Sequence, residues 1–204
     1  PNPMSLKPNR STMAILVIGE FIFGLGDSLL IAAGVGNTPW TVLAEGIADT
    51  TEVWTIGEAT FLVSVAVMFL WIPIKETPGI GTILNIIIIA LTIHVMVPIL
   101  PQPENPLVSI LMASLGILLV GIGSTMYLTA NLGPGPRDGW MTGLQRTTGI
   151  PIGRVRIAIE SSVLVIGIVL GGTFGIGTIL FAVTIGPVVA SCLSIASRID
   201  STTG

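Results

Sequence analysis

The chain has 204 residues, of which 51% are hydrophobic and only 9% are charged, whereas a soluble domain carries about 25% charged residues. With a mean hydropathy of +0.93 and a formal charge of −3, this composition excludes a soluble enzyme, a nucleic-acid-binding domain with a basic surface, and a disordered tail. The single cysteine, Cys192, excludes an intrachain disulfide framework and a cysteine zinc site. We therefore expect an all-α integral membrane protein, with residues 1–204 forming one membrane domain.

The apolar residues lie in long blocks, and a helix that crosses a bilayer needs about 20 of them. Six blocks approach or meet that length. In chain order they are Met13–Ala33, Ala59–Ile74, Gly79–Leu100, Pro106–Ala130, Ile157–Gly171 and Gly175–Ala196. These blocks predict six transmembrane helices.

The basic residues predict the orientation of the six helices. If the N-terminus is cytoplasmic, all eight cations fall on the cytoplasmic side, as the positive-inside rule requires. They are Lys7, Arg10, Lys75, Arg137, Arg146, Arg154, Arg156 and Arg198. We therefore expect both termini in the cytoplasm.

The two halves of the chain repeat each other at an offset of 97 residues, or 96 after a one-residue gap. Gly24-Leu25-Gly26 aligns with Gly121-Ile122-Gly123, Gly36-x-x-Pro39 with Gly133-x-x-Pro136, and Gly79–Leu84 recurs unchanged at Gly175–Leu180. Each unit (about 13–100 and 106–197) holds three predicted helices. Because three is odd, the second unit must enter the membrane inverted, an arrangement typical of secondary transporters and several channels.

A short extra helix is expected in each unit after its Gly/Pro motif, over Trp40–Asp49 and Arg137–Thr147, the second ending at Gly149. Such helices either dip into the membrane, where their N-termini would favour an anionic or polar ligand, or lie flat on its surface. Trp40, Trp54 and Trp140 favour the headgroup level. The sequence leaves these alternatives open.

Charged residues inside the predicted helices suggest a site. Glu20 and Asp27 lie seven residues apart and share one helix face, which favours a polar cavity or a proton or cation site. Alternatively, Glu20 bonds a neighbouring helix as a neutral acid and Asp27 lies near the outer interface. Glu160 is four residues after Arg156 and can pair with it.

The candidate site lies between the two units, where the Gly/Pro motifs of the two halves meet. Asp27 and Glu20 are the expected coupling or cavity carboxylates, and Arg137 and Asp138 the expected cytoplasmic gate or ligand contacts. The full set is Glu20, Asp27, Gly36, Pro39, Gly133, Pro136, Arg137, Asp138 and Glu160. For the arginines, headgroup anchoring is the alternative interpretation.

Two further features have structural interpretations. His94, the only histidine, is either a proton relay or a neutral ring bonded to a carbonyl near the outer end of its span, and without a second histidine or cysteine at ligand spacing no metal or cofactor is expected. Gly167, Gly171 and Gly175 form two G-x-x-x-G steps that predict close helix packing. Their partner is either within the chain or another subunit.

The stretch Leu132–Leu144, with Gly149–Arg156 and Gly171–Thr178, resembles the YczE/YitT-type family of small bacterial membrane proteins. The resemblance extends to Pro39-Trp40 and Gly79–Leu84 in the first half. It implies a bacterial cytoplasmic membrane and a polytopic helical fold, and it brings no catalytic residues.

These observations predict a small transporter that moves a polar or charged solute through a site between two inverted repeats. The alternatives are a non-transporting scaffold subunit of a larger membrane complex and a passive channel. The bilayer, a polar or anionic solute, and other subunits or further copies are the expected partners, and nucleic acid is not. No nucleophile–base pair supports an enzyme.

Overall fold

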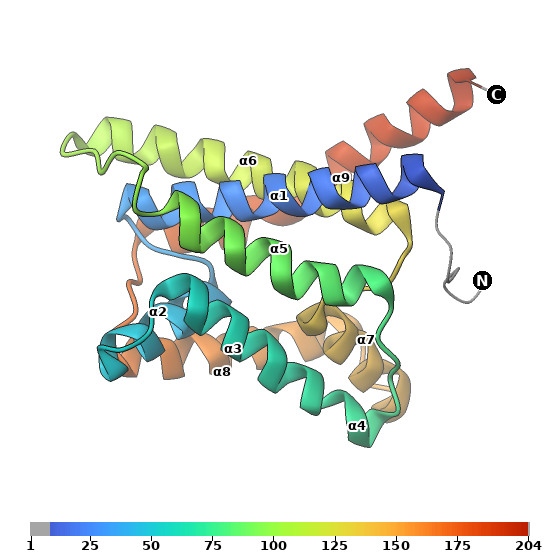
Figure 1. The fold of residues 1–204 in the computed structure, drawn as a ribbon, viewed down its shortest axis with the longest axis horizontal. Coiled ribbons are helices and arrows are strands. Elements are labelled where there is room, and N and C mark those ends of the chain that lie inside the picture. Colours follow the sequence, from blue (N-terminus) through green and yellow to red (C-terminus); the bar gives the residue numbers. More distant parts are fainter. Residues whose placement is uncertain (1–8, 204) are drawn as a thin grey trace.

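The computed structural model describes residues 9–203, which fold into helices without strands (Figure 1). Lys7, one of the cations used to predict the orientation, lies outside the described residues. The helices are α1 (Arg10–Ala33), α2 (Pro39–Thr51), α3 (Ile56–Phe69), α4 (Trp71–Ile74), α5 (Ile80–Met96), α6 (Pro106–Ala130), α7 (Pro136–Thr148), α8 (Ile152–Val169) and α9 (Ile176–Thr203).

Four helical segments of the described chain are long and apolar enough to cross a membrane: α1, α3 with α4, α6 and α9. Helix α5 is apolar but has only 17 residues. Helix α8 starts five residues before the predicted span, so its first turns contain Arg154 and Arg156. Because the described residues form helices without strands and four segments could cross a membrane, the prediction of an all-α membrane protein is confirmed.

Local sequence signals fix several helix ends. Thr38 caps α2 through a hydrogen bond that its hydroxyl accepts from the Thr41 N–H, and Pro39 and Pro136 occupy the first positions of α2 and α7. Gly149 ends α7 at a φ of +72°, with its N–H bonded to the Gln145 carbonyl. Both short helices predicted after the Gly/Pro motifs are therefore present.

Helices α1 and α6 cross closely because glycines remove side chains at the contact. A Cβ on Gly26 would lie 2.5 Å from the Gly116 carbonyl oxygen, and one on Gly123 would lie 2.5 Å from the Gly19 oxygen. The earlier residue of α1 meets the later residue of α6, so the two helices run antiparallel. Such close approach of backbones is how helices associate where lipid provides no hydrophobic drive.

The short helices α2 and α7 are inserted among the longer ones. Helix α2 packs against α8 and α3, and α7 packs against α3 and α8, so each short helix contacts both halves of the chain. Trp40 is only 7% exposed, whereas Trp54 is 43% exposed. Trp40 is therefore packed inside the protein, because the first turn of α2 is directed into it. The headgroup level expected for the tryptophans stays a prediction.

Each copy of the repeated six-residue motif, Gly79–Leu84 and Gly175–Leu180, contacts the glycine loop of the opposite half of the chain. The Gly81 N–H donates to the Leu132 carbonyl over 2.9 Å, and the Gly177 N–H donates to the Val35 carbonyl over 2.8 Å. A Cβ on Gly36 would lie 2.7 Å from the Thr178 hydroxyl oxygen. One on Gly133 would lie 2.8 Å from the equivalent oxygen of Thr82 in the other copy. Both loop glycines also have a φ near +120°, which disfavours any side chain there.

The G-x-x-x-G glycines pack inside the chain. A Cβ on Gly167 would lie 2.6 Å from the backbone nitrogen of Leu43 in α2, and one on Gly175 would lie 2.3 Å from the Val35 carbonyl oxygen. The close partners of Gly167 and Gly175 are α2 and the loop before it.

Candidate functional site

A cavity of about 430 Å³ lies where the N-termini of α2 and α7 converge. Pro39 and Pro136, the first residues of the two short helices, both line it. Its other walls come from α1, α5, α6, α8 and α9, so both halves of the chain contribute. The volume is within the range of small-molecule sites, about 300–1,000 Å³.

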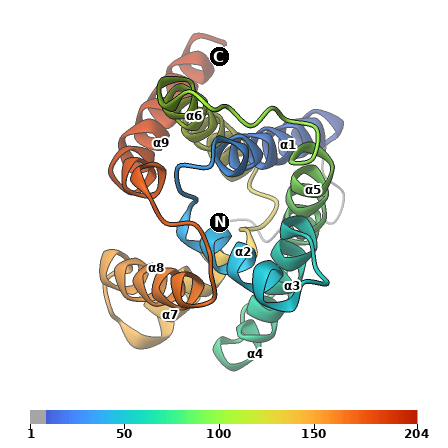
Figure 2. The same cartoon turned by 90° about the vertical axis from the view of Figure 1, so that its left-hand side faces the viewer.

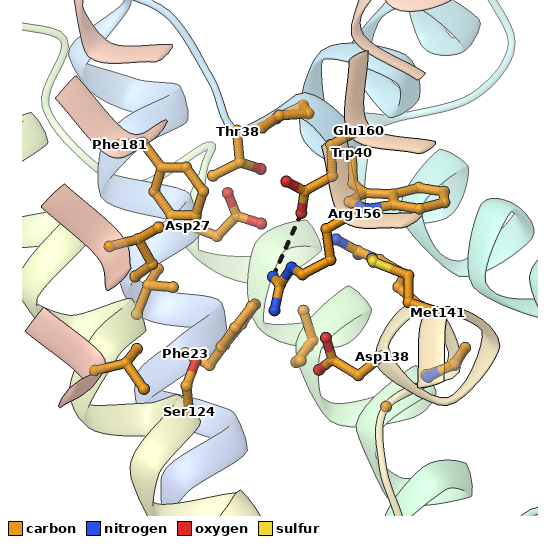
Figure 3. Close-up of a pocket in the computed structure, with 18 of the residues that line it drawn as sticks. Phe23, Asp27, Thr38, Trp40, Ser124, Asp138, Met141, Arg156, Glu160 and Phe181 are labelled. Atoms are coloured by element: carbon orange, nitrogen blue, oxygen red, sulfur yellow. Dashed lines mark hydrogen bonds and ion pairs between the residues drawn. The ribbon is translucent and has the colours of Figure 1, made fainter. Parts of the chain in front are cut away.

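Most of the predicted site residues line this cavity. They are Asp27, Pro39, Pro136, Arg137, Asp138 and Glu160. Figure 3 shows the side chains of Asp27, Asp138 and Glu160 directed into the same space. Gly36 and Gly133 do not line it, because they form the loop contacts described above.

Asp27 is held by the first turn of α2. The carboxylate is 1% exposed and accepts hydrogen bonds from the Thr41 hydroxyl at 3.0 and 2.9 Å, while the Thr38 hydroxyl donates to the Thr41 oxygen at 2.9 Å. The N-terminal end of a helix also carries partial positive charge, which favours a carboxylate there. Asp27 is thus a positioned anion at the cavity wall.

Arg137 lies opposite, in the first turn of α7. Its guanidinium carbon is 5.4 Å from the ring centroid of Trp40, a cation–π distance. It also interacts electrostatically with Asp27 and Asp138. Asp138 in turn accepts a hydrogen bond from the hydroxyl of Tyr127 on α6. An acidic residue therefore lies at the first turn of each short helix, with Arg137 interacting with both.

Arg156 and Glu160 form the predicted ion pair along α8, with 3.5 Å between a guanidinium nitrogen and a carboxylate oxygen (Figure 3). Both residues also line the cavity. Arg156 was expected only to pair with Glu160 or to anchor the helix at the headgroups, so its place in the cavity is an addition to the predicted set.

Glu20 is fully buried in α1 but does not line the cavity. Neither of its carboxyl oxygens has a hydrogen-bond partner among the described residues. It lies near Asn85 of α5, a residue that does line the cavity. Glu20 is therefore one layer behind the wall, on the same helix as Asp27.

His94 has a structural contact outside the cavity. Its Nδ1 lies 3.0 Å from the Thr55 hydroxyl, and a Cβ on Gly57 would lie 2.6 Å from the His94 Cβ. The ring therefore helps to join α5 to the start of α3. Among the described residues, no three acidic, histidine or cysteine side chains come together at a spacing that suits a metal ion.

Sequence reasoning missed the neutral residues of the site, namely Trp40, Thr41 and Tyr127. Each occupies a helix face that hydropathy alone assigns to packing. For Trp40 and Thr41 a signal was available, since they occupy the positions of the second repeat's Arg137 and Asp138.

Comparison with known proteins places the chain in a family. A model described as a family of unknown function (DUF6198) matches residues 10–194. The chain belongs to this family. It is 45% identical over 188 residues to an uncharacterized protein of Haemophilus influenzae, covering 92% of this chain and 86% of that protein.

Two relatives come from Bacillus subtilis. The uncharacterized membrane protein YczE is 33% identical over 173 residues, which cover 82% of this chain and 79% of YczE. The uncharacterized protein YyaS is 28% identical over 176 residues, covering 80% and 83%. No solved structure matches the chain. The match to YczE confirms the resemblance found in the sequence and agrees with a membrane protein.

Proposed function

We propose that this protein is a small membrane transporter that moves a polar or charged solute through the cavity between two inverted three-helix repeats. The observation that carries the proposal is the cavity itself. It is built from both halves, and charged side chains of both signs line it. A protein that only scaffolds a larger complex has no need of such an interior.

The repeats are supported by paired contacts. Helices α1 and α6 cross antiparallel through glycines at equivalent positions, and α2 packs on α8 as α7 packs on α3. Six spans are part of the proposal, with α5 and α8 crossing although they fall short of the length and composition of the other four.

We propose a bacterial inner-membrane location with both termini cytoplasmic. The start of α1, the α4–α5 connection and the end of α9 lie toward the same end of the molecule (Figure 1). The α5–α6 connection lies toward the other end. This arrangement agrees with the one-sided distribution of lysine and arginine in the sequence.

The test is flux into proteoliposomes, with acetate, inorganic phosphate, glycine, choline and dodecyl phosphate as probes. We expect flux of at least one probe, abolished by Asp27→Asn and by Arg137→Gln. Arg146→Gln is the matched control, because Arg146 is on the same helix but pairs with Glu76 outside the cavity, at 3.1 Å.

Unchanged flux in Asp27→Asn and Arg137→Gln would refute the site. No flux of any probe, together with copurification of a larger partner from native membranes in mild detergent, would favour the scaffold. Flux that does not saturate with probe concentration would favour the passive channel.

A further inference from the structure

We propose that the ligand of this cavity is an amphiphile with an anionic head group, and that it enters and leaves sideways between α8 and α9. This inference rests on the proposed function, since it names the class of solute and its route. It follows from where the cavity opens and from which of its polar groups have no partner.

The cavity opens between α8 and α9. Ile157 and Ser161 on α8 and Ala182 on α9 line the cavity and are also exposed on the surface of the protein. Helix α9 packs against α6 but makes no comparable contact with α8. Figure 2 shows the same separation, with α8 and α9 apart on one side of the molecule.

The equivalent place in the other half is closed. Helices α3 and α5 pack together (Figure 2). Gly57 at the start of α3 lies directly against His94 of α5. Its equivalent on α8 is Gly153, where an added Cβ would meet no atom within 4 Å. The opening is therefore a difference between two otherwise similar halves. In a membrane it faces lipid rather than water.

Two donors at this end of the cavity have hydrogen-bonding capacity left. Among the described residues, Arg137 donates no hydrogen bond, although its guanidinium carries five N–H groups, lies over the Trp40 ring and interacts electrostatically with Asp27 and Asp138. The buried indole N–H of Trp40, which lines the cavity, has no partner either. No side chain caps the N-terminus of α7, whereas Thr38 caps α2. All three features suit an anionic oxygen acceptor.

The carboxylates of the cavity, by contrast, are already engaged. Asp27 accepts from Thr41, Asp138 accepts from Tyr127, and Glu160 pairs with Arg156. Asp27 and Asp138 also reduce the net positive field at Arg137. A carboxylate or phosphate ligand gains from Arg137 and from the uncapped N-terminus of α7, whereas a cation would have to displace existing partners.

The α9 wall beside the opening is apolar, whereas the α8 wall also carries Arg156 and Glu160. The apolar lining residues here are Phe181, Ile185 and Val189 on α9 and Leu164 on α8. These residues connect the charged end of the cavity to the outer apolar surfaces of α8 and α9. A ligand that extends from Arg137 toward the opening therefore meets hydrocarbon along its length, as the chain of a fatty acid or lipid does.

The test is equilibrium binding of tritiated laurate to the full chain in lipid nanodiscs, with empty nanodiscs subtracted. Competitors share the chain and differ in the head group: dodecyl phosphate, dodecanol and dodecyltrimethylammonium. Acetate supplies the anionic group without the chain. We expect saturable binding that dodecyl phosphate displaces and that dodecanol, dodecyltrimethylammonium and acetate do not.

Two variants test where the head group binds and which route the ligand takes, and each has a matched control. Arg137→Gln should weaken laurate binding at least tenfold, and Arg146→Gln should leave it unchanged. Ala182→Trp places an indole in the opening and should weaken binding at least tenfold. Val183→Trp, on the lipid-facing side of the same helix and outside the cavity, should not. Unchanged melting temperatures confirm that the variants fold.

Several results would overturn the inference while the proposed function stands on its own flux assay. If acetate competes as well as unlabelled laurate would, the ligand is a small hydrophilic anion. If dodecyltrimethylammonium competes that well, the head group that the cavity binds is a cation and not an anion. Absence of saturable laurate binding would exclude the ligand class. Full laurate binding in Ala182→Trp would exclude the lateral route. If Ala182→Trp instead separates a dimer on size-exclusion chromatography, a second copy covers the opening.

Discussion

Replacing Gly26 by alanine tests how far the crossing of α1 and α6 holds the cavity together. The added Cβ would lie 2.5 Å from the Gly116 oxygen and 2.7 Å from the Val120 nitrogen. Ordinary contact begins at 3.4 Å, so the approach to the oxygen is too short by about 0.9 Å. Both neighbours are backbone atoms of a helix and cannot rotate away. Helix α1 must therefore move away from α6.

Overpacking of this kind costs about 1–3 kcal/mol. In a chain of this size, each kcal/mol lowers the melting temperature by about 2–4 °C. We therefore expect Gly26→Ala to melt several degrees below the native protein in detergent micelles, followed by tryptophan fluorescence. Binding in the cavity should weaken as well, because Asp27 follows Gly26 directly and lines the cavity.

Gly186→Ala in α9 is the matched control, since its Cβ would meet no atom within 4 Å. Alanine is the better helix former by about 0.5–1 kcal/mol, so this variant should melt at or above the native temperature. If Gly26→Ala and Gly186→Ala melt at the same temperature, α1 and α6 are not in contact as described, and the reasoning fails.

Three further substitutions probe residues that lie behind the walls of the site. Thr41→Val removes a hydroxyl that donates to the Asp27 carboxylate and should destabilise the protein by about 1.5–3 kcal/mol, measured by thermal melting. Trp71→Phe removes the 2.8 Å hydrogen bond from the indole N–H to the Pro136 carbonyl and should cost about 1 kcal/mol, also by melting. Glu20→Gln replaces a buried carboxyl that has no hydrogen bond, so the melting temperature should stay the same or rise.

Exposed counterparts serve as controls for the first two. Thr142→Val on α7 removes a hydroxyl that bonds only carbonyls of its own helix, and Trp54→Phe changes an indole outside the cavity. Either control destabilising as much as its partner would contradict the assigned hydrogen bond. A fall of several degrees in Glu20→Gln would mean that the carboxyl has a partner in the native membrane.

The sequence predicted the helices well where a single signal decides them. Gly149 ends α7 as expected, and the span from Pro106 to Ala130 has the predicted bounds, because composition and capping act locally. The start of α8 was placed too late, since hydropathy treats Arg154 and Arg156 as outside a span although they form regular helix. A charged residue raises the free energy of placing a segment in lipid, but it does not end a helix.

The charged residues of the candidate site were found from the sequence, whereas the contacts between its helices and loops were not. Asp27 and Arg137 stand out because an ionisable group in an apolar block needs a reason. Periodicity cannot say which loop a helix end will meet, so the pairing of each repeated motif with the loop of the other half was not foreseen. This pairing explains why Gly79–Leu84 and Gly175–Leu180 have the same sequence, since each copy must pack against an equally close glycine loop.

The two halves keep the same residues where backbones touch and differ where the cavity is lined. Gly26 corresponds to Gly123 in the crossing of α1 and α6, whereas Asp27 corresponds to Ser124 in the cavity wall. Likewise the first turn of α2 offers the indole of Trp40 where α7 offers a guanidinium. Two similar halves therefore surround a cavity in which Asp27 lies on the α1 wall and Arg137 at the start of α7. In the proposed binding mode, this difference between the walls orients a ligand with one charged end.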